Sequence, residues 1–107
     1  MSDVFIGKGN LHGKGVYAGR SFKKGEVIKQ YNIRVISAEE FASLSPEDRD
    51  STHTRSGRIY LYGEPDRYTN HSSTPNTIQD FEHHCDIALR DIEKGEMITT
   101  DSTKEDF

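Results

Sequence analysis

The sequence predicts a mainly β fold with one short helix, and three observations lead to this prediction. Short runs of alternating apolar and polar residues recur along the chain, as half-buried strands require. Glycines lie around many of these runs, and glycine accepts the backbone angles of tight turns. Only one segment carries the start signal of a helix. The 107 residues form one predicted domain, residues 1–107, because two cores would each be too small to offset the entropy of ordering the backbone.

Six short runs are predicted to be strands. They span residues 4–6, 15–18, 26–30, 33–36, 59–62 and 97–99. Residues 22–28 and 92–98 share a pattern, in which an apolar residue and one further residue precede Lys-Gly-Glu, a second apolar residue and Ile. Both segments are predicted to turn at the glycine and to enter a strand, so the fold is expected to be assembled from hairpins.

The helix is predicted to begin after Ser37. Glu40 follows three residues later, which is the spacing of a capping box. Phe41 and Leu44 then share one helix face, and Pro46 limits how far the helix can run. Residues 45–58 are polar and have no apolar periodicity, so they are predicted to be an exposed connection without a domain boundary.

Composition narrows the classes of function and partner. Hydrophobic residues make up 32% of the chain and charged residues 30%, so the core is lean and a second subunit, as in a homodimer, is one expected source of added stability. The formal charge is -4, and the Lys and Arg residues are scattered, so nucleic acid is not an expected partner. No stretch has the apolar length of a membrane span or the pattern of a secretion signal, so no membrane association is expected. The single cysteine excludes an internal disulfide, and an intracellular location is expected.

The strongest motif is Arg-Tyr-Thr-Asn-His-Ser-Ser-Thr-Pro-Asn at residues 67–76. Its composition alone is that of an ordinary turn. Two further motifs stand in order around it. Gly-Lys-Gly-Val-Tyr-Ala occupies residues 13–18, and Ile-Ala-Leu-Arg-Asp-Ile, at residues 87–92, leads into residues 94–99. A lone Gly-x-Gly is a weak signal, but three ordered motifs that cover almost the whole chain favour one shared site.

Together these motifs resemble the SET-domain family, whose signature is Asn-His-Ser-x-x-Pro-Asn, usually preceded by Arg and an aromatic residue. The resemblance covers residues 9–102 and indicates a minimal SET domain. It implies a SET-domain-like β-clip of small sheets with a knot-like C-terminal crossing. It also implies S-adenosyl-L-methionine as the cofactor, and the activity of the protein lysine methyltransferases on a lysine-bearing protein or peptide.

The resemblance implies a cofactor site formed by two loops. A Gly-x-Gly turn lets backbone approach a ligand closely because two positions lack a Cβ. In the family the Asn-His pair contacts the cofactor, with the Asn side chain at its amino-acid end. Carried over to this chain, the predicted cofactor-binding residues are Lys14, Gly15, Val16, Tyr17, Asn70 and His71.

The predicted catalytic residues concern the acceptor lysine. Only the neutral amine is nucleophilic, while a free lysine has a pKa of about 10.4, so a desolvated aromatic channel favours reaction. Tyr60, Tyr62 and Tyr68 are the aromatic residues close to the signature, and strand packing is their alternative role. Ser102 takes the position at which the family has a channel tyrosine, after Asp101. Tyr60 or Tyr68 is expected to fill the space that this shorter side chain leaves.

Departures from the family pattern leave two hypotheses. The insert that shapes the substrate groove is short, between residues 36 and 59. The last channel wall must come from Phe107 or from a dimer mate, or else it is missing. The first hypothesis is a lysine methyltransferase that lacks the usual C-terminal tyrosine. The alternative is a catalytically inactive SET-like module that binds cofactor or peptide. Ser102 is the residue that separates them.

Two other chemistries are not favoured. A metal site would draw on His71, His83, His84 and Cys85, but adjacent histidines on a strand point to opposite faces. No metal is therefore expected. A hydrolase would draw on acidic residues near the end of the chain, but turns and exposed strand faces account for most of them. These are Asp91, Glu93, Glu96 and Asp101.

Overall fold

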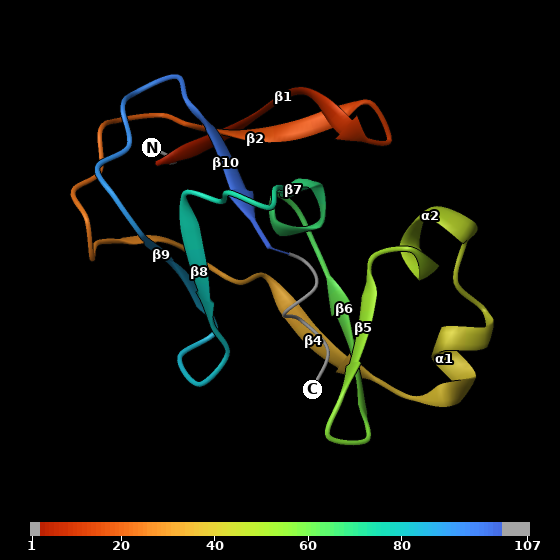
Figure 1. The fold of residues 1–107 in the computed structure, drawn as a ribbon. Coiled ribbons are helices and arrows are strands. Elements are labelled where there is room, and N and C mark those ends of the chain that lie inside the picture. Colours follow the sequence, from red (N-terminus) through yellow and green to blue (C-terminus); the bar gives the residue numbers. More distant parts are fainter. Residues whose placement is uncertain (1–2, 102–107) are drawn as a thin grey trace.

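Three small sheets build the protein, and the computed structural model describes residues 3–101 (Figure 1). Their strand orders are β1-β2-β10-β7, β3-β9-β8 and β4-β6-β5. Only β7 and β10 pair in parallel, and the other pairs among the described residues are antiparallel. The strands are β1 (Val4–Leu11), β2 (Lys14–Ala18), β3 (Val27–Gln30), β4 (Ile33–Ile36), β5 (Thr52–Arg55), β6 (Arg58–Tyr62), β7 (Asn70–His71), β8 (Thr77–Asp80), β9 (Cys85–Ala88) and β10 (Met97–Thr100).

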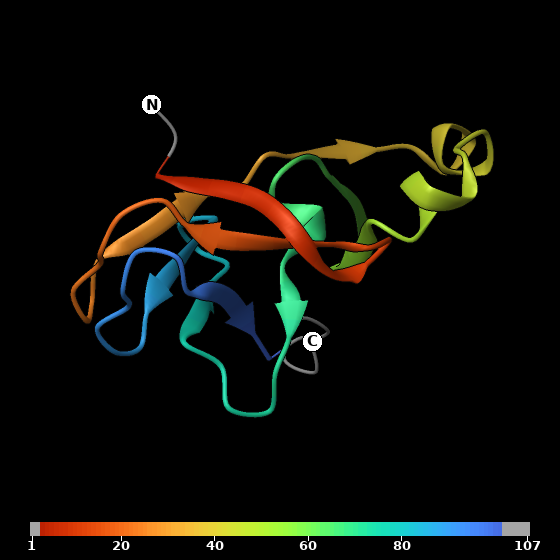
Figure 2. The same ribbon diagram turned by 90° about the horizontal axis from the view of Figure 1, so that it is seen from above.

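The last strand determines how the chain closes. β10 lies between β2 and β7, antiparallel to the first and parallel to the second. The end of the described chain therefore runs between the N-terminal hairpin and the signature motif, as the predicted C-terminal crossing requires (Figures 1 and 2). The mainly β fold of small sheets is confirmed.

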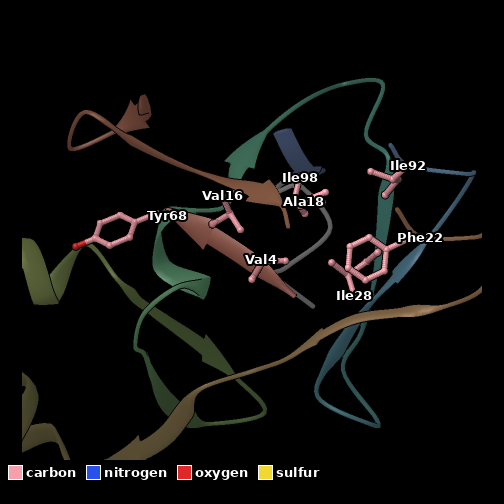
Figure 3. Packing of buried hydrophobic residues seen from close by; sticks show 9 residues of the cluster. Val4, Val16, Ala18, Phe22, Ile28, Tyr68, Ile92 and Ile98 are labelled. Atoms are coloured by element: carbon pink, nitrogen blue, oxygen red, sulfur yellow. The ribbon is translucent and has the colours of Figure 1, made fainter. Parts of the chain in front are cut away.

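The core is a cluster of nine buried apolar side chains that come from five strands, the single helical turn η1 (Asp66–Tyr68) and two turns (Figure 3). Its members are Val4, Val16, Ala18, Phe22, Ile28, Tyr68, Ala88, Ile92 and Ile98. Phe22 and Ile92 are each 1% exposed and lie in the two Lys-Gly-Glu segments. Complete burial of such a side chain contributes about 1.5–3 kcal/mol, so the repeated segments anchor the core as well as turning the chain.

The two Lys-Gly-Glu segments are related by an approximate twofold axis. Phe22 and Ile92 exchange backbone hydrogen bonds, with N···O distances of 2.8 and 2.9 Å. The amides of Gly25 and Gly95 each donate, over 2.8 Å, to the carbonyl of the alanine that precedes the other segment. Both glycines have positive φ, 89° and 92°, as the predicted turns require. Each turn is therefore closed partly by the other.

The predicted helix is confirmed as α1 (Ala38–Ala42). The Ser37 hydroxyl accepts a hydrogen bond from the Glu40 amide over 3.1 Å, which is the first half of a capping box. The Glu40 carboxylate forms an ion pair with Arg34 at 2.5 Å instead of completing the capping box. Glu40 therefore ties the helix to β4.

The prediction that residues 45–58 form an exposed connection is wrong. They contain a second helix, α2 (Pro46–Arg49), and the strand β5. Ser45 caps α2 by accepting from the Asp48 amide over 3.2 Å, and Pro46 is tolerated because the first turn of a helix has no partner for its N–H. β5 pairs with β6 across a tight turn, and this pairing stabilises a strand that has no apolar pattern of its own. Both helices lie at one end of the molecule (Figure 2).

β8 and β9 were not among the predicted strands, and the turn between them corrects one argument. His83 and His84 lie in this turn rather than on a strand, and His84 has a positive φ of 53°. Cys85 begins β9, where it is buried and unpaired with any other cysteine, and burial raises the pKa of its thiol. Within residues 3–101, no helix is long and apolar enough to span a membrane.

Candidate functional site

The signature motif begins with a single helical turn, η1 (Asp66–Tyr68), and continues as the short strand β7. Asn70 pairs with Thr99, and His71 pairs with Thr100, in the parallel ladder with β10. The Ser72 amide extends this contact by donating to the Thr100 carbonyl over 2.9 Å. The middle of the motif is therefore held by backbone bonds to the last strand.

Asn70 joins the signature motif to the N-terminal hairpin. Its side chain is buried, and its Nδ2 donates to the carbonyls of Lys14, over 3.0 Å, and Tyr68, over 2.8 Å. Its Oδ1 accepts from the Asn10 amide over 2.8 Å. These bonds use both N–H donors and one acceptor position of the amide. The structure thus brings the Gly-x-Gly turn and the Asn-His pair together.

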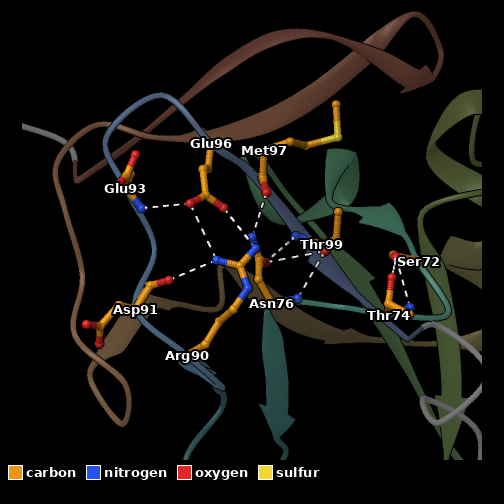
Figure 4. Close-up of polar contacts among 9 residues, drawn as sticks. All are labelled: Ser72, Thr74, Asn76, Arg90, Asp91, Glu93, Glu96, Met97 and Thr99. Atoms are coloured by element: carbon orange, nitrogen blue, oxygen red, sulfur yellow. Dashed lines mark hydrogen bonds and ion pairs between the residues drawn. The ribbon is translucent and has the colours of Figure 1, made fainter.

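Asn76 holds the other end of the motif to the same strand, β10 (Figure 4). Its Nδ2 donates to the Met97 carbonyl over 2.8 Å, and its Oδ1 accepts from the Thr99 amide over 2.9 Å. Asn76 belongs to the signature but is not one of the predicted site residues. Its role is that of a brace behind the loop, because its side chain bonds to β10 and to Glu96, which directly precedes β10.

The other predicted cofactor residues occupy the hairpin. Gly13 has a φ of 78°, and a Cβ placed there would meet no atom within 4 Å, so its surroundings are open. The Val16 side chain is fully buried in the core, so only its backbone can face a ligand. Tyr17 stacks on Phe5 with ring centroids 5.6 Å apart. Lys14 places its ammonium 4.7 Å from the centre of the Tyr68 ring.

A hollow of about 190 Å³ lies beside this hairpin and the first half of the signature. It is lined by Leu11, Asp50, Ser51, His53, Tyr62, Asp66, Arg67 and Thr69. Arg67 is fixed by its Nε, which donates to the Tyr62 carbonyl over 2.9 Å, and by an ion pair with Asp48 at 2.7 Å. The Arg67 guanidinium lowers the pKa of Asp48, so this pair stays charged at neutral pH.

A smaller cavity of about 20 Å³ continues inward from the hollow and shares Tyr62, Asp66 and Thr69 with it. Its remaining wall comes from Lys29, Tyr31, Gln79, Asp86 and Thr100. Thr69 is notable because its hydroxyl is buried and has no hydrogen-bond partner in the described part of the chain. A buried polar atom without a partner is rare and is a reason to expect a ligand or water beside it.

A buried ionic cluster forms the inner wall of this cavity. The Lys29 ammonium lies 2.7 Å from Asp66 and 2.8 Å from Asp86, and the three side chains are at most 7% exposed. Burial opposes the charge of Lys29, but the carboxylates of Asp86 and Asp66 outweigh it and raise the lysine pKa. The Tyr31 hydroxyl donates to Asp86 over 2.6 Å. Sequence reasoning missed this cluster because charged residues in short strands normally face solvent.

The predicted catalytic residues do not meet at this cavity. Tyr68 is buried in the core (Figure 3). Its hydroxyl donates to Glu47 over 3.2 Å. Tyr60 lines a separate hollow with His53 and Phe81. Ser102 lies outside the described residues. The aromatic walls of the cavity are Tyr62, on β6, and Tyr31, which follows β3 and was not singled out from the sequence.

The histidines are dispersed among different partners. His71 is 3.8 Å from Asp101, and His83 is 2.7 Å from Asp80, which raises the pKa of His83 through a hydrogen bond. In residues 3–101, no three His, Cys, Asp or Glu side chains cluster as metal ligands. Of the acidic residues near the end of the chain, Glu96 pairs with Arg90 at 2.9 Å and caps its own turn (Figure 4).

Comparison with known proteins decides the family. The family model for the SET domain matches residues 13–101, which contain all three motifs. The chain belongs to the SET-domain family. The match ends at Asp101, the last residue that the structure describes.

Two Plasmodium falciparum proteins of very different length are similar to this SET domain. The Variant-silencing SET domain-containing protein of Plasmodium falciparum is 30% identical over 92% of this chain, and the match spans 5% of that relative. The crystal structure of a P. falciparum candidate histone methyltransferase has a TM-score of 0.71 at 22% identity, over 94% of this chain and 93% of the other.

Two structures of the Chaetomium thermophilum Polycomb Repressive Complex 2 are also similar. The one bound to S-adenosylmethionine has a TM-score of 0.75 at 23% identity, and the humanised mutant bound to the inhibitor GSK126 has 0.73 at 25%. They cover 97% and 95% of this chain and 15% of each larger chain. The SET domain thus shares its fold with the candidate histone methyltransferase and with the two Polycomb structures, which confirms the predicted SET-domain-like fold of small sheets.

Proposed function

We propose that this SET domain is an S-adenosylmethionine-dependent methyltransferase that transfers a methyl group to a lysine side chain of a protein or peptide. The observation that carries the proposal is the Asn70 contact. It joins the Gly-x-Gly turn to the Asn-His strand beside a hollow, with N···O distances of 2.8–3.0 Å. Membership of the SET-domain family and the S-adenosylmethionine-bound relative support the choice of cofactor.

The residues present fit such a cofactor. The open surroundings of Gly13 allow the backbone to approach a ligand. Gly15 is packed differently, because a Cβ there would lie 3.1–3.3 Å from atoms of the protein itself. The unpartnered Thr69 hydroxyl offers a polar contact at the entrance to the inner cavity. Backbone groups of residues 12–15 and of Asn70 and His71 are the expected holding groups.

S-adenosylmethionine supplies an activated methyl group on a sulfonium, so the residues mainly align the acceptor. Tyr62 and Tyr31 give the inner cavity a partly aromatic wall, and its narrowness excludes bulk water. Such desolvation lowers the pKa of an incoming lysine and favours the neutral, nucleophilic amine. Asp66 and Asp86 are already paired with Lys29, so they do not offer a free carboxylate to the acceptor.

A module that binds cofactor or peptide without methyl transfer is the second candidate function. The observation in its favour is Ser102, which replaces the tyrosine expected at the end of the family motif. Neither Tyr60 nor Tyr68 lines the inner cavity in place of that side chain. Loss of an aligning hydroxyl would reduce turnover while leaving the cofactor side of the site intact.

Calorimetric titration with S-adenosylmethionine, followed by incubation with a lysine-rich peptide and mass spectrometry, tests the proposal. We expect saturable heat of binding and a peptide mass increase of methyl groups on lysine. Binding without methylation would support the second candidate. Absence of binding would exclude both functions for this cofactor.

Substitution of Ser102 by tyrosine tests the role of that position. We expect Ser102→Tyr to raise the rate of peptide methylation at least tenfold, because it restores the aligning hydroxyl. A tenfold change in rate corresponds to about 1.4 kcal/mol of barrier. Ser102→Phe is the matched control, since it restores the ring without the hydroxyl. Equal rates for the two variants would show that the aromatic wall, rather than the hydroxyl, was missing.

A further inference from the structure

A second, larger hollow takes no part in the proposed reaction. Its volume is about 510 Å³, and it shares no lining residue with the hollow beside the hairpin. Residues 3–6 form one side, Ile28 and Lys29 of β3 form the other, and Glu64 and Pro65 close one end. We refer to it as the β1 groove.

The β1 groove runs along a free strand edge. β1 is the outermost strand of its sheet, so its backbone pairs with β2 on one side only. The Gly19 amide donates to the Asp3 carbonyl over 2.8 Å, which places the backbone groups of Asp3 on the β2 side. Because these groups alternate along an antiparallel strand, those of Val4 and Ile6 face outward. An incoming strand can pair with both residues.

The groove combines apolar surface with acidic charge. Val4 and Ile28 are buried in its floor, while Phe5 remains 49% exposed and Ile6 37% exposed. The Glu64 carboxylate has no ion-pair partner among residues 3–101, and Asp3 has only an exposed contact with Arg20 at 3.5 Å. Lys29 does not neutralise this charge, because its ammonium is buried between two other carboxylates.

We propose that the β1 groove binds an extended basic segment of a partner polypeptide, which adds as a strand to the outer edge of β1. Backbone bonds to Val4 and Ile6 provide affinity, and alternate side chains provide specificity. Apolar side chains of the partner contact Ile6 and Pro65, and its Lys or Arg side chains approach Glu64. A second copy of this chain is a poor occupant, because symmetric pairing of two β1 edges would bring acidic groups together.

An alternating Val-Lys peptide of about six residues, the usual length of a strand, is the probe. The protein is ¹⁵N-labelled, and amide hydrogen exchange is measured with and without the peptide. We expect exchange at Val4 and Ile6 to slow, and affinity to fall as salt is added. A Val-Glu peptide of the same length is expected not to bind. Unchanged exchange at both amides, or equal binding of the two peptides, would overturn the proposal.

Two variants separate charge from backbone pairing. Glu64→Lys is expected to weaken the Val-Lys peptide about tenfold or more, because it reverses the charge at the groove. Ile6→Pro is expected to abolish strand addition, since it removes an outward N–H that an edge strand can lose without unfolding. Glu82→Lys is the matched control, because it reverses the charge of an exposed residue in the β8–β9 turn and should leave the affinity for the peptide unchanged. A dimer that protects the same amides would assign the groove to a second copy and refute the basic partner.

Discussion

At the scale of single residues, two asparagines hold the signature motif from different sides. Asn70 bonds to the N-terminal hairpin, and Asn76 bonds to β10. Both are 3% exposed, so each makes its bonds away from water. They differ in that only Asn70 joins the two loops predicted to contact the cofactor. This difference allows a stability effect to be separated from a binding effect.

Asn70→Ala tests this separation. The variant leaves the Asn10 amide and the Lys14 and Tyr68 carbonyls without their partner, and we expect a loss of about 1–3 kcal/mol in the free energy of unfolding. We also expect at least tenfold weaker binding of S-adenosylmethionine by calorimetry. Asn76→Ala is the control: a similar loss of stability with nearly unchanged affinity. Equal effects on affinity would mean that the two residues share a purely structural role.

A single cation, Lys29, balances two buried carboxylates. Lys29→Met removes this cation, and breaking a buried ion pair costs about 3–5 kcal/mol. Without it, two carboxylates stay buried beside each other with no cation between them, and this cost is largest where both carry charge. We expect denaturant unfolding to show Lys29→Met more stable at acidic than at neutral pH.

Lys23→Met is the matched control for this experiment. The Lys23 side chain is 82% exposed, and its ammonium lies 3.9 Å from Asp91, whose side chain is 67% exposed. Its removal is expected to change the free energy of unfolding by about 0.5 kcal/mol or less, with no inverted pH dependence. A Lys29→Met variant that behaves like this control would show that the buried cluster is open to water.

At the scale of elements, the twofold-related turns carry equivalent capping groups. The Glu26 carboxylate accepts from the Lys23 amide over 2.8 Å, and the Glu96 carboxylate accepts from the Glu93 amide over 3.0 Å. Arg20 and Arg90 pair with these carboxylates at 3.1 and 2.9 Å. The same sequence pattern therefore produced the same local structure twice.

Glu26→Gln and Glu96→Gln test whether the two turns contribute alike. In each turn, hydrogen bonds hold the pKa of the carboxyl below its ordinary value. The largest contribution comes from the backbone amide of Lys23 for Glu26, and from the side chain of Arg90 for Glu96. A lowered pKa gives stability that is present above the unfolded value and is lost as the pH falls through the folded value. We expect each variant to be less stable than wild type at neutral pH and to converge with it in acid. Persistence of the difference in acid would assign it to packing rather than charge.

Glycine in β1 shows why an element boundary was missed. The prediction ended this strand at residue 6, whereas β1 continues to Leu11. Gly9 interrupts the apolar pattern, yet a Cβ there would lie 2.3 Å from the Lys14 carbonyl oxygen. The two strands of the hairpin approach so closely that only glycine fits at this position. The sequence of one strand alone shows a residue of low β propensity and does not show the close approach of its partner.

At the scale of the whole molecule, the proposed function predicts that ligand binding and folding are coupled. Three separated segments form the proposed site, so a ligand that bridges them would bind the folded state alone. At a concentration of S-adenosylmethionine about 100 times its dissociation constant, we expect stabilisation of about 2.7 kcal/mol. That corresponds to a rise in melting temperature on the order of 10 °C for a small domain. Thermal unfolding with and without the cofactor measures this, and methionine at the same concentration is the control. An unchanged melting temperature would argue against a site built from all three segments.

The sequence by itself determined the family, the mainly β class, the first helix and the two Lys-Gly-Glu turns. These features depend on local chemistry: a serine cap, glycines with positive φ, and an ordered set of short motifs. The signals of α2 and β5 are also local, a serine cap followed by proline and a tight hairpin with β6, but the sequence analysis missed them. Tertiary structure alone decided that Tyr31 rather than Tyr60 or Tyr68 lines the inner cavity, and that Lys29 is buried between two carboxylates. The physical reason is that strand pairing, burial and ion pairing join residues far apart in the chain, so no local pattern encodes them.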